Sequence, residues 1–155
     1  MQPPKSKPLW LALIRQLQAN GQPDKWSLFL AHEQEPGLLY ELRTKECDNN
    51  LAYLYEAPVG KVHLPSPGHT WSMYTMRSIT NDEAKRVHEV AGRQPIQGLD
   101  SGSDGRDFVS ASQRWVENII EELVEEGVLE PRVLKDVRSM MGPSRLSHFK
   151  SPTAA

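Results

Sequence analysis

SASQRWVENIIEELVEEG, residues 110–127, has the clearest helical periodicity in the chain, and the expected fold is built outward from it. Its apolar side chains recur at the spacing of one helical face, and glutamates fill most of the other face, which we expect to be solvated. The apolar positions are Trp115, Val116, Ile119, Ile120, Leu123 and Val124. Ser110 and Gln113 have the spacing of a capping box, so the helix is predicted to begin at Ser110 and to end at Gly127. One face of this helix should therefore lie in a hydrophobic core.

Ser112 is the residue of this helix with the most chemical interest. It precedes Trp115 by three residues and Val116 by four, so the predicted helix directs it to the buried side. A helix that begins at Ser110 also puts Ser112 in the first turn, where free backbone N–H groups create a partly positive field. Activated nucleophiles are often held in such a field. Ser112 is therefore a candidate nucleophile.

The composition limits the number of domains and the kind of partner. With 155 residues, of which 38% are hydrophobic, the chain can form one domain with a real core but not two. We expect a flexible arm over residues 1–7, a single domain over residues 8–142 and a flexible tail over residues 143–155. The formal net charge of −2 gives no excess of basic side chains for phosphates, so no nucleic-acid partner is expected.

The N-terminal region and the single cysteine bear on the compartment. Residues 1–20 lack the charged start, apolar middle and cleavage site of a signal peptide, and Cys47 has no second cysteine with which to form an internal disulfide. The longest apolar run, residues 9–14, is too short to cross a bilayer. We therefore expect a cytoplasmic protein without a membrane span; its oligomeric state is left open.

The first half of the chain is typical of β-strands. Residues 26–31 and 38–43 alternate on either side of the Glu35-Pro36-Gly37 turn, which predicts a hairpin. Residues 9–17 are ambiguous, because a short apolar run fits a buried strand as well as a helix. The helical reading rests on the spacing of Trp10, Leu13, Ile14 and Leu17.

Two further strands are predicted around a proline-rich excursion. Residues 51–56 have the aromatic content and alternation of a strand, and residues 69–76 should return as another. Residues 46–50, which include Cys47, are predicted to form a polar loop. Cys47 is interpreted as a free thiol without a role, because no His or Lys lies beside it in a way that would activate it.

Two more helices are predicted near the end of the chain. Thr80 and Glu83 form a capping box that starts a helix ending near Gly92. Its inward residues are expected to be Ala84, Val87, His88 and Ala91. A loop over residues 94–106, rich in Gly, Ser and Asp, is expected to be mobile. Pro131 opens the last helix, and its inward residues should be Val133, Leu134, Val137, Met140 and Met141.

The order of strands first and helices last predicts an α+β fold, with an antiparallel sheet of about five strands and helices packed on one side. Three segments carry a resemblance to known proteins: KWSLFL at residues 25–30, GLLYEL at residues 37–42 and ASQRWV at residues 111–116. Together they resemble permuted papain-like hydrolases of the NlpC and lecithin:retinol acyltransferase type. The chain also resembles a group of small uncharacterised fungal proteins, and this similarity is closer. It is carried by the Tyr55-Glu56 strand, the proline-containing loop after it, the capped helix and the late Gln113-x-Trp115-Val116 helix, and it would span roughly residues 9–129.

The resemblance implies a permuted papain-like fold with substituted catalytic positions. In those hydrolases a histidine at the start of the second strand is the base, and a cysteine that opens the late helix is the nucleophile. Lys25 and Ser112 stand at these places. A serine hydroxyl needs a base to remove its proton, and an ordinary lysine is protonated near neutral pH. The resemblance thus favours a non-catalytic domain that binds a small molecule or a protein, as an accessory protein of fungal metabolism would.

Two enzymatic alternatives stay open. Burial of Lys25 would favour its neutral form and restore a Ser–Lys pair, which would make the chain a hydrolase, acyltransferase or cyclase that uses Ser112. A serine introduced in place of a natural cysteine would give the same sequence and would make the natural chain a thiol enzyme.

The histidines offer other candidates. His32 ends the second strand in phase with Trp26 and could assist Ser112, although a residue that caps the strand edge is the simpler interpretation. His63 and His69 lie on either side of the proline-rich excursion. They are candidates for a replacement base near Ser112 or for a pair of metal ligands, and a solvated loop is the simpler interpretation. For His88 we expect a hydrogen-bonded core position. No metal site is predicted from so few ligands.

The expected ligand-binding residues are Trp26, Tyr40, Gln113, Trp115 and His69, because apolar ligands are held by aromatic walls with few polar anchors. Core packing is the alternative for the aromatic members of this set. Residues 101–105 lack the lysine and helix spacing of a phosphate-binding loop, so no nucleotide and no other cofactor is expected. Asp100, Asp104 and Asp107 lack the downstream bidentate acid of a calcium loop.

Overall fold

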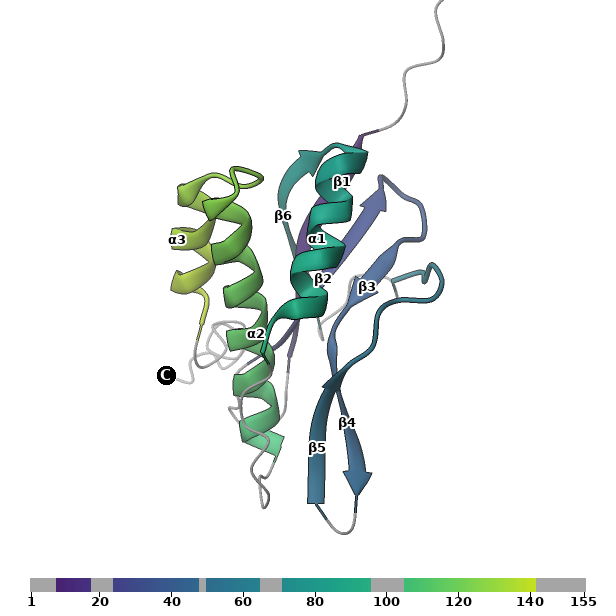
Figure 1. Ribbon diagram of the computed structural model, residues 1–155, viewed down its shortest axis with the longest axis vertical. Coiled ribbons are helices and arrows are strands. Elements are labelled where there is room, and N and C mark those ends of the chain that lie inside the picture. The colour runs from purple at the N-terminus through teal and green to yellow at the C-terminus, as the bar shows by residue number, and fades with distance from the viewer. Residues whose placement is uncertain (1–7, 18–23, 48–49, 65–70, 96–104, 142–155) are drawn as a thin grey trace, which may run out of the picture.

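The computed structural model describes residues 8–17, 24–47, 50–64, 71–95 and 105–141 (Figure 1). The predicted arm over residues 1–7, the predicted tail and most of the predicted mobile loop lie outside these residues. The elements, in chain order, are β1 (Leu9–Gln16), β2 (Lys25–His32), β3 (Leu38–Tyr40), β4 (Leu42–Cys47), β5 (Asn50–Tyr55), β6 (Trp71–Ile79), α1 (Asn81–Arg93), α2 (Gly105–Glu125) and α3 (Pro131–Ser139).

The described strands form two antiparallel sheets. Four of them pair in the order β3-β2-β1-β6, and β4 and β5 form a separate two-stranded ribbon that extends beyond the end of the larger sheet (Figure 1). The α+β class with an antiparallel sheet is therefore confirmed, although the described strands number six in two sheets rather than about five in one. The ambiguous segment, residues 9–17, contains β1, which has a hydrogen-bonded neighbour on each side.

The predicted hairpin at residues 26–43 is confirmed in its first part, where Leu30 of β2 lies opposite Leu38 of β3. The strand is interrupted at Glu41, and the chain continues as β4 in the ribbon. The predicted polar loop over residues 46–50 is wrong, because β4 and β5 pair as far as Cys47 and Asn50. Only residues 48 and 49 separate the two strands.

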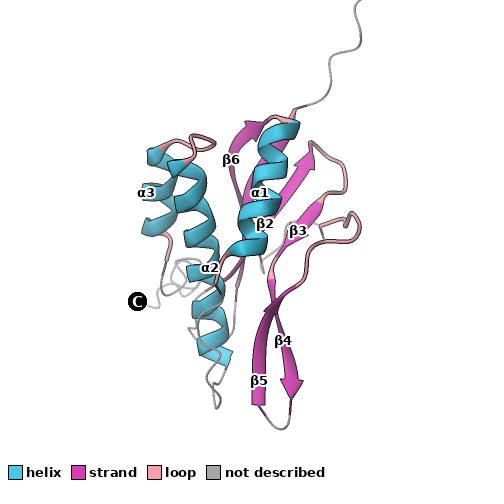
Figure 2. Cartoon of the chain, viewed as in Figure 1, coloured by secondary structure: helices cyan, strands magenta, loops and turns pink. Residues whose placement is uncertain are grey.

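All three helices pack on one face of the four-stranded sheet (Figure 2). Alternate residues of β1 and β2 point to this face, so that Leu11 and Leu28 lie in one core with residues of the helices. The predicted apolar face of α2 is confirmed: Trp115, Val116, Ile119, Ile120 and Leu123 are buried. Burial of such side chains is the main source of the stability of a domain of this size.

The predicted start of α2 at Ser110 is wrong, because the helix begins five residues earlier, at Gly105. Ser112 is the eighth helical residue and lies in the third turn, since a turn takes 3.6 residues. The free N–H groups of the helix belong to its first four residues. The partly positive field expected at Ser112 is therefore not provided by the helix start.

Helix α2 ends at Glu125, and the predicted left-handed stop is confirmed at Gly127, whose φ is +82°. The N–H of Gly127 donates to the carbonyl oxygen of Val124 at 3.0 Å, and the N–H of Val128 donates to that of Leu123 at 2.9 Å. This pair of bonds is the Schellman motif, and it satisfies carbonyl groups that the helix leaves without a partner. Val128 and Leu123 are both buried, which adds the apolar contact that usually accompanies the motif.

Helix α1 starts with the predicted capping box. The N–H of Glu83 donates to Thr80 Oγ1 at 3.1 Å, and the N–H of Thr80 donates to Glu83 Oε1 at 2.9 Å. Val87 is buried as expected, but His88 is exposed rather than in the core. Its ring packs edge-on against Tyr40, with Nδ1 3.3 Å from the phenol oxygen, because the helix turns this position to the rim of the sheet.

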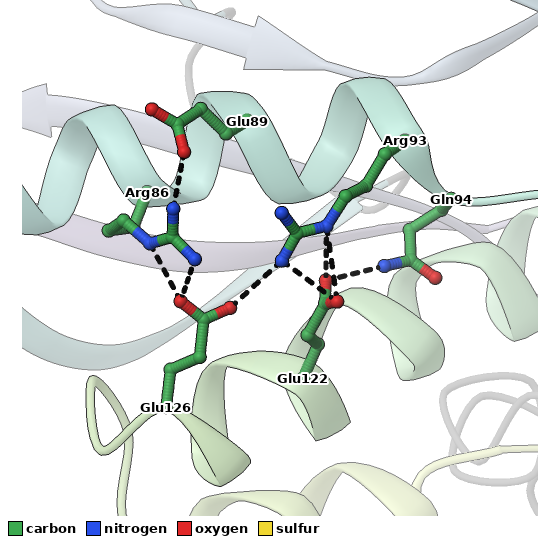
Figure 3. Close-up of polar contacts among 6 residues, drawn as sticks. All are labelled: Arg86, Glu89, Arg93, Gln94, Glu122 and Glu126. Atoms are coloured by element: carbon green, nitrogen blue, oxygen red, sulfur yellow. Dashed lines mark hydrogen bonds and ion pairs between the residues drawn. The ribbon is translucent and has the colours of Figure 1, made fainter.

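The glutamates of α2 are more than a solvated surface, because two of them bind arginines of α1 (Figure 3). Arg93 lies 2.9 Å from Glu122 and 3.1 Å from Glu126. Glu126 also accepts hydrogen bonds from Arg86. One carboxylate thus bridges two guanidinium groups, and the network fixes α1 beside α2. Single exposed ion pairs contribute little, but linked ones contribute more.

We predict that Arg93→Met lowers the free energy of unfolding by about 0.5–1 kcal/mol at low salt, because it breaks the contacts with Glu122 and Glu126. Urea unfolding should show this loss shrinking in about 1 M NaCl, where the charges are screened. Arg132→Met is the matched control, since Arg132 is 79% exposed and pairs only with the nearby Glu130 among the described residues. A loss of the same size at high salt would contradict an ionic origin.

Candidate functional site

Ser112 and Gln113 fasten α2 to the beginning of β2. The Ser112 hydroxyl oxygen accepts a hydrogen bond from the backbone N–H of Trp26 at 3.1 Å, and Gln113 Nε2 donates to the carbonyl oxygen of Asp24 at 2.8 Å. Ser112 is 0% exposed and Gln113 is buried. Both side chains therefore satisfy backbone groups that would otherwise be buried without partners, which costs free energy.

Lys25 is not brought to Ser112. Trp26 points into the core beneath α2, and adjacent residues of a strand point to opposite faces, so the Lys25 side chain points away from the helix. Its ammonium nitrogen lies 3.4 Å from Glu41 Oε2, and the side chain is 22% exposed. The hydroxyl and the ammonium group thus lie on opposite faces of β2. A Ser–Lys pair is not assembled in this arrangement.

His32 lies at the far end of β2 from the Ser112 contact. It is opposite Leu9 in the sheet, whereas Lys25 is opposite Gln16. Its Nδ1 is 3.2 Å from the carbonyl oxygen of Pro8. The length of the strand therefore separates this imidazole from the Ser112 hydroxyl. His69, the other histidine expected near the site, lies outside the described residues.

The aromatic residues expected to bind a ligand lie in the core. Trp26, Tyr40 and Trp115 are each at most 1% exposed. Tyr55 joins them, with its ring centroid 5.1 Å from that of Trp115. Burial raises the pKa of Tyr55 to about 12, and burial together with the nearby Tyr55 phenol raises that of Tyr40 to about 12. Both phenols are therefore neutral at ordinary pH, as a packed core requires.

Three polar atoms of this aromatic cluster are buried without a hydrogen-bond partner among the described residues. They are Trp26 Nε1, Trp115 Nε1 and the Tyr55 hydroxyl oxygen. Buried polar groups without partners are uncommon and lower stability. Their cost here must be offset by the large apolar area that the two indoles and the phenol ring bury.

A pocket of about 620 Å³ opens on the other face of the sheet, away from the helices. Its lining residues are Trp10, Ala12, Phe29, Ala31, His32, Glu33, Gln34, Glu35, His63, Leu64, Trp71, Met73 and Thr75. Small residues of the inner strands lie in the hollow beside large aromatic ones. Ala12 lies opposite Phe29 and Thr75, and Ala31 lies opposite Trp10.

The pocket is walled on one side by residues 62–64, which are tied to the sheet through Gly37. The N–H of Gly37 donates to the carbonyl oxygen of Val62 at 3.0 Å, and the N–H of Val62 donates back to that of Gly37 at 2.8 Å. Leu64 packs against the buried Phe29 and Ala31. A Cβ at position 37 would overlap the Ala31 side chain and the Leu30 carbonyl, so this close approach requires glycine.

The pocket was missed in the sequence, although β2 contains a signal for it. Its apolar residues are not confined to the helix-facing positions: Phe29 and Ala31 are apolar on the other face. A sheet with one face in water normally alternates apolar and polar residues. Met73, which is 52% exposed, continues this apolar outer face onto β6.

Two kinds of site are absent from the described part of the chain. No three His, Cys, Asp or Glu side chains lie together there in a way that could hold a metal ion. Within the same residues, no helix has the length and apolar character needed to cross a bilayer.

Comparisons with models of protein families, with curated proteins and with solved structures gave no match.

We predict that Ser112→Ala lowers the free energy of unfolding by about 1–3 kcal/mol, because it leaves the N–H of Trp26 buried without its acceptor. Urea unfolding measures the change. Ser139→Ala is the control: its hydroxyl also bonds to a backbone group, donating to the carbonyl oxygen of Asp136, but it is exposed, so the change should be below about 0.5 kcal/mol. Equal losses in the two variants would contradict an anchoring role for Ser112.

We predict that Tyr55→Phe leaves the free energy of unfolding at pH 7 unchanged or higher, because the hydroxyl lost has no partner. Tyr74→Phe should cost about 1 kcal/mol, since the Tyr74 hydroxyl donates to Asp136 at 3.1 Å. Urea unfolding of both variants at pH 7 makes the comparison. A loss in Tyr55→Phe as large as that in Tyr74→Phe would mean that the Tyr55 hydroxyl has a stabilising partner.

The same variant has a second expected effect at alkaline pH. The pKa of Tyr55 is raised from 10.0 to about 12 in the folded chain, so the native state keeps a proton that the unfolded state releases. The stability that this contributes is complete below pH 10 and is lost as the pH rises to about 12. Unfolding free energy should therefore fall less steeply over this range in Tyr55→Phe than in the wild type.

Proposed function

We propose that the chain is a non-catalytic domain that binds an apolar small molecule in the pocket on the outer face of the sheet. The observation that carries this proposal is the hollow between Trp10, Phe29 and Trp71, which has a volume typical of ligand sites. Seven of its thirteen lining residues are apolar, and four of the six polar ones lie at the end of β2 and in the turn that follows it. Such a combination is what small-molecule sites commonly have.

A non-catalytic role is supported by the surroundings of Ser112. A nucleophilic serine needs a base within hydrogen-bond reach and a path for the substrate. Ser112 has no exposed surface, its oxygen accepts the Trp26 N–H, and Lys25 points to the other face. The hydroxyl is better suited to joining helix and strand than to attacking an acyl group.

A papain-like origin of the scaffold remains part of this proposal. It is supported by the sequence segments that resemble such hydrolases and by the contact of the late helix with the start of the second strand. In this view the positions of the old nucleophile and base, Ser112 and Lys25, have become structural. The ligand site has formed on the opposite face of the sheet.

The proposal is tested with N-phenyl-1-naphthylamine, a neutral apolar dye whose fluorescence rises when it leaves water. Wild-type protein should bind it, and Thr75→Trp should weaken binding by about tenfold or more, because an indole at this exposed position would cover the hollow above Ala12. Thr75→Val keeps the size of the side chain and should stay within about twofold of the wild type.

Two results would overturn the proposal. One is dye binding that is absent in the wild type or unchanged in Thr75→Trp. The other is covalent labelling of the wild type by a fluorophosphonate that disappears in Ser112→Ala, since this reagent reacts with activated serines. The second result would restore the hydrolase, acyltransferase or cyclase alternative.

A further inference from the structure

The pocket is long and has different chemistry at its two ends. Its lining runs from Trp71, which lies opposite Gln16 at one end of β1, to the turn that follows His32, which lies opposite Leu9 at the other end. Along β1, Gln16 lies seven residue steps from Leu9, which corresponds to roughly 23 Å. A ligand that fills the pocket is therefore elongated, with distinct groups at each end.

The end near Trp71 is apolar. Met73 joins Trp71 there, and the buried Ile14 lies opposite Met73 on the neighbouring strand. No charged side chain among the lining residues belongs to this end. It offers a surface for a hydrocarbon chain, whose burial is favoured in proportion to the apolar area removed from water.

The other end is acidic and contains one large aromatic ring. Glu33 and Glu35 lie in the turn after β2, and the lining contains no lysine or arginine. Trp10 lies opposite Ala31, next to this turn. His63 completes the polar rim. The mouth thus combines the Glu33 carboxylate with the indole ring of Trp10.

Carboxylates and an indole favour the same kind of group. A carboxylate attracts a cation by charge, and the face of a tryptophan attracts one through its quadrupole, most effectively when the cation is a substituted ammonium. An anionic head would meet repulsion from Glu33. A neutral head would gain only hydrogen bonds, which water supplies equally well at an exposed mouth.

We propose that the ligand is a cationic amphiphile, a long-chain amine or quaternary ammonium compound. Its head lies between Trp10 and the Glu33–Glu35 turn, and its chain extends over Ala12 and Phe29 to Trp71. This inference rests on the function proposed above and adds the chemical class of the ligand. The helix face of the sheet, including Ser112, takes no part in it.

The test compares three decyl compounds that differ only in the head: decyltrimethylammonium, decanol and decanoate. Each is kept below its micelle concentration, and displacement of N-phenyl-1-naphthylamine from the full chain gives its affinity. Decyltrimethylammonium should bind with at least roughly fivefold higher affinity than decanol, and decanoate should bind most weakly. Raising the salt concentration should reduce the difference between the heads.

Glu33→Gln tests the contribution of the Glu33 charge alone, because it removes the charge and keeps the size of this exposed side chain. It should weaken the cation roughly two- to fivefold and leave the alcohol unchanged. Glu125→Gln, an exposed change at the end of α2, is the matched control and should alter neither. A decrease for the alcohol equal to that for the cation would contradict an electrostatic role for Glu33.

The outcomes separate this inference from the function on which it rests. If the three compounds bind equally well and Thr75→Trp weakens all of them, the cationic class is wrong and the pocket stands as a ligand site. Tighter binding of the carboxylate overturns the cationic class in the same way. If no compound displaces the dye, or if Thr75→Trp has no effect on displacement, both proposals fail together.

Discussion

The packing of α2 on β2 is the contact on which the rest of the structure depends. Two buried hydrogen bonds, from Trp26 N–H to Ser112 and from Gln113 to Asp24, fix the helix on the beginning of the strand. With the helix in place, Trp26 and its alternate neighbours form the core, and the residues between them are directed to the other face. The same strand therefore shapes both the hydrophobic core and the outer pocket, which is why a buried serine can matter without being a nucleophile.

The sequence predicted correctly those features that depend on bonds between residues close together in the chain. The capping box at Thr80 and Glu83 and the left-handed Gly127 depend on bonds within a few residues, and both are present. The start of α2 was mistaken because Ser110 has the sequence of a cap, while five preceding residues continue the helix. A pattern for a helix start is also acceptable inside a helix, so spacing alone does not decide between them.

Other features depend on contacts between distant segments, and the sequence did not determine them. Residues 9–17 form a strand because β2 and β6 supply partners on both sides, a fact that periodicity does not contain. Lys25 and Ser112 were paired by resemblance, but their placement depends on which face of β2 each approaches. The sequence does not predict the pocket, because apolar residues on both faces of a strand indicate only that both faces are covered. They do not indicate which face the helices cover.

Because of Gly37, the position of the pocket mouth does not depend on the side chains that line it. The wall formed by residues 62–64 is held to the sheet by main-chain hydrogen bonds, and the position that holds it has no side chain. The backbone thus determines where the mouth lies, whereas neighbouring side chains such as Glu33 and His63 determine its polarity and charge. Substitutions at those positions would change the chemistry of the mouth without altering the backbone contacts that place it.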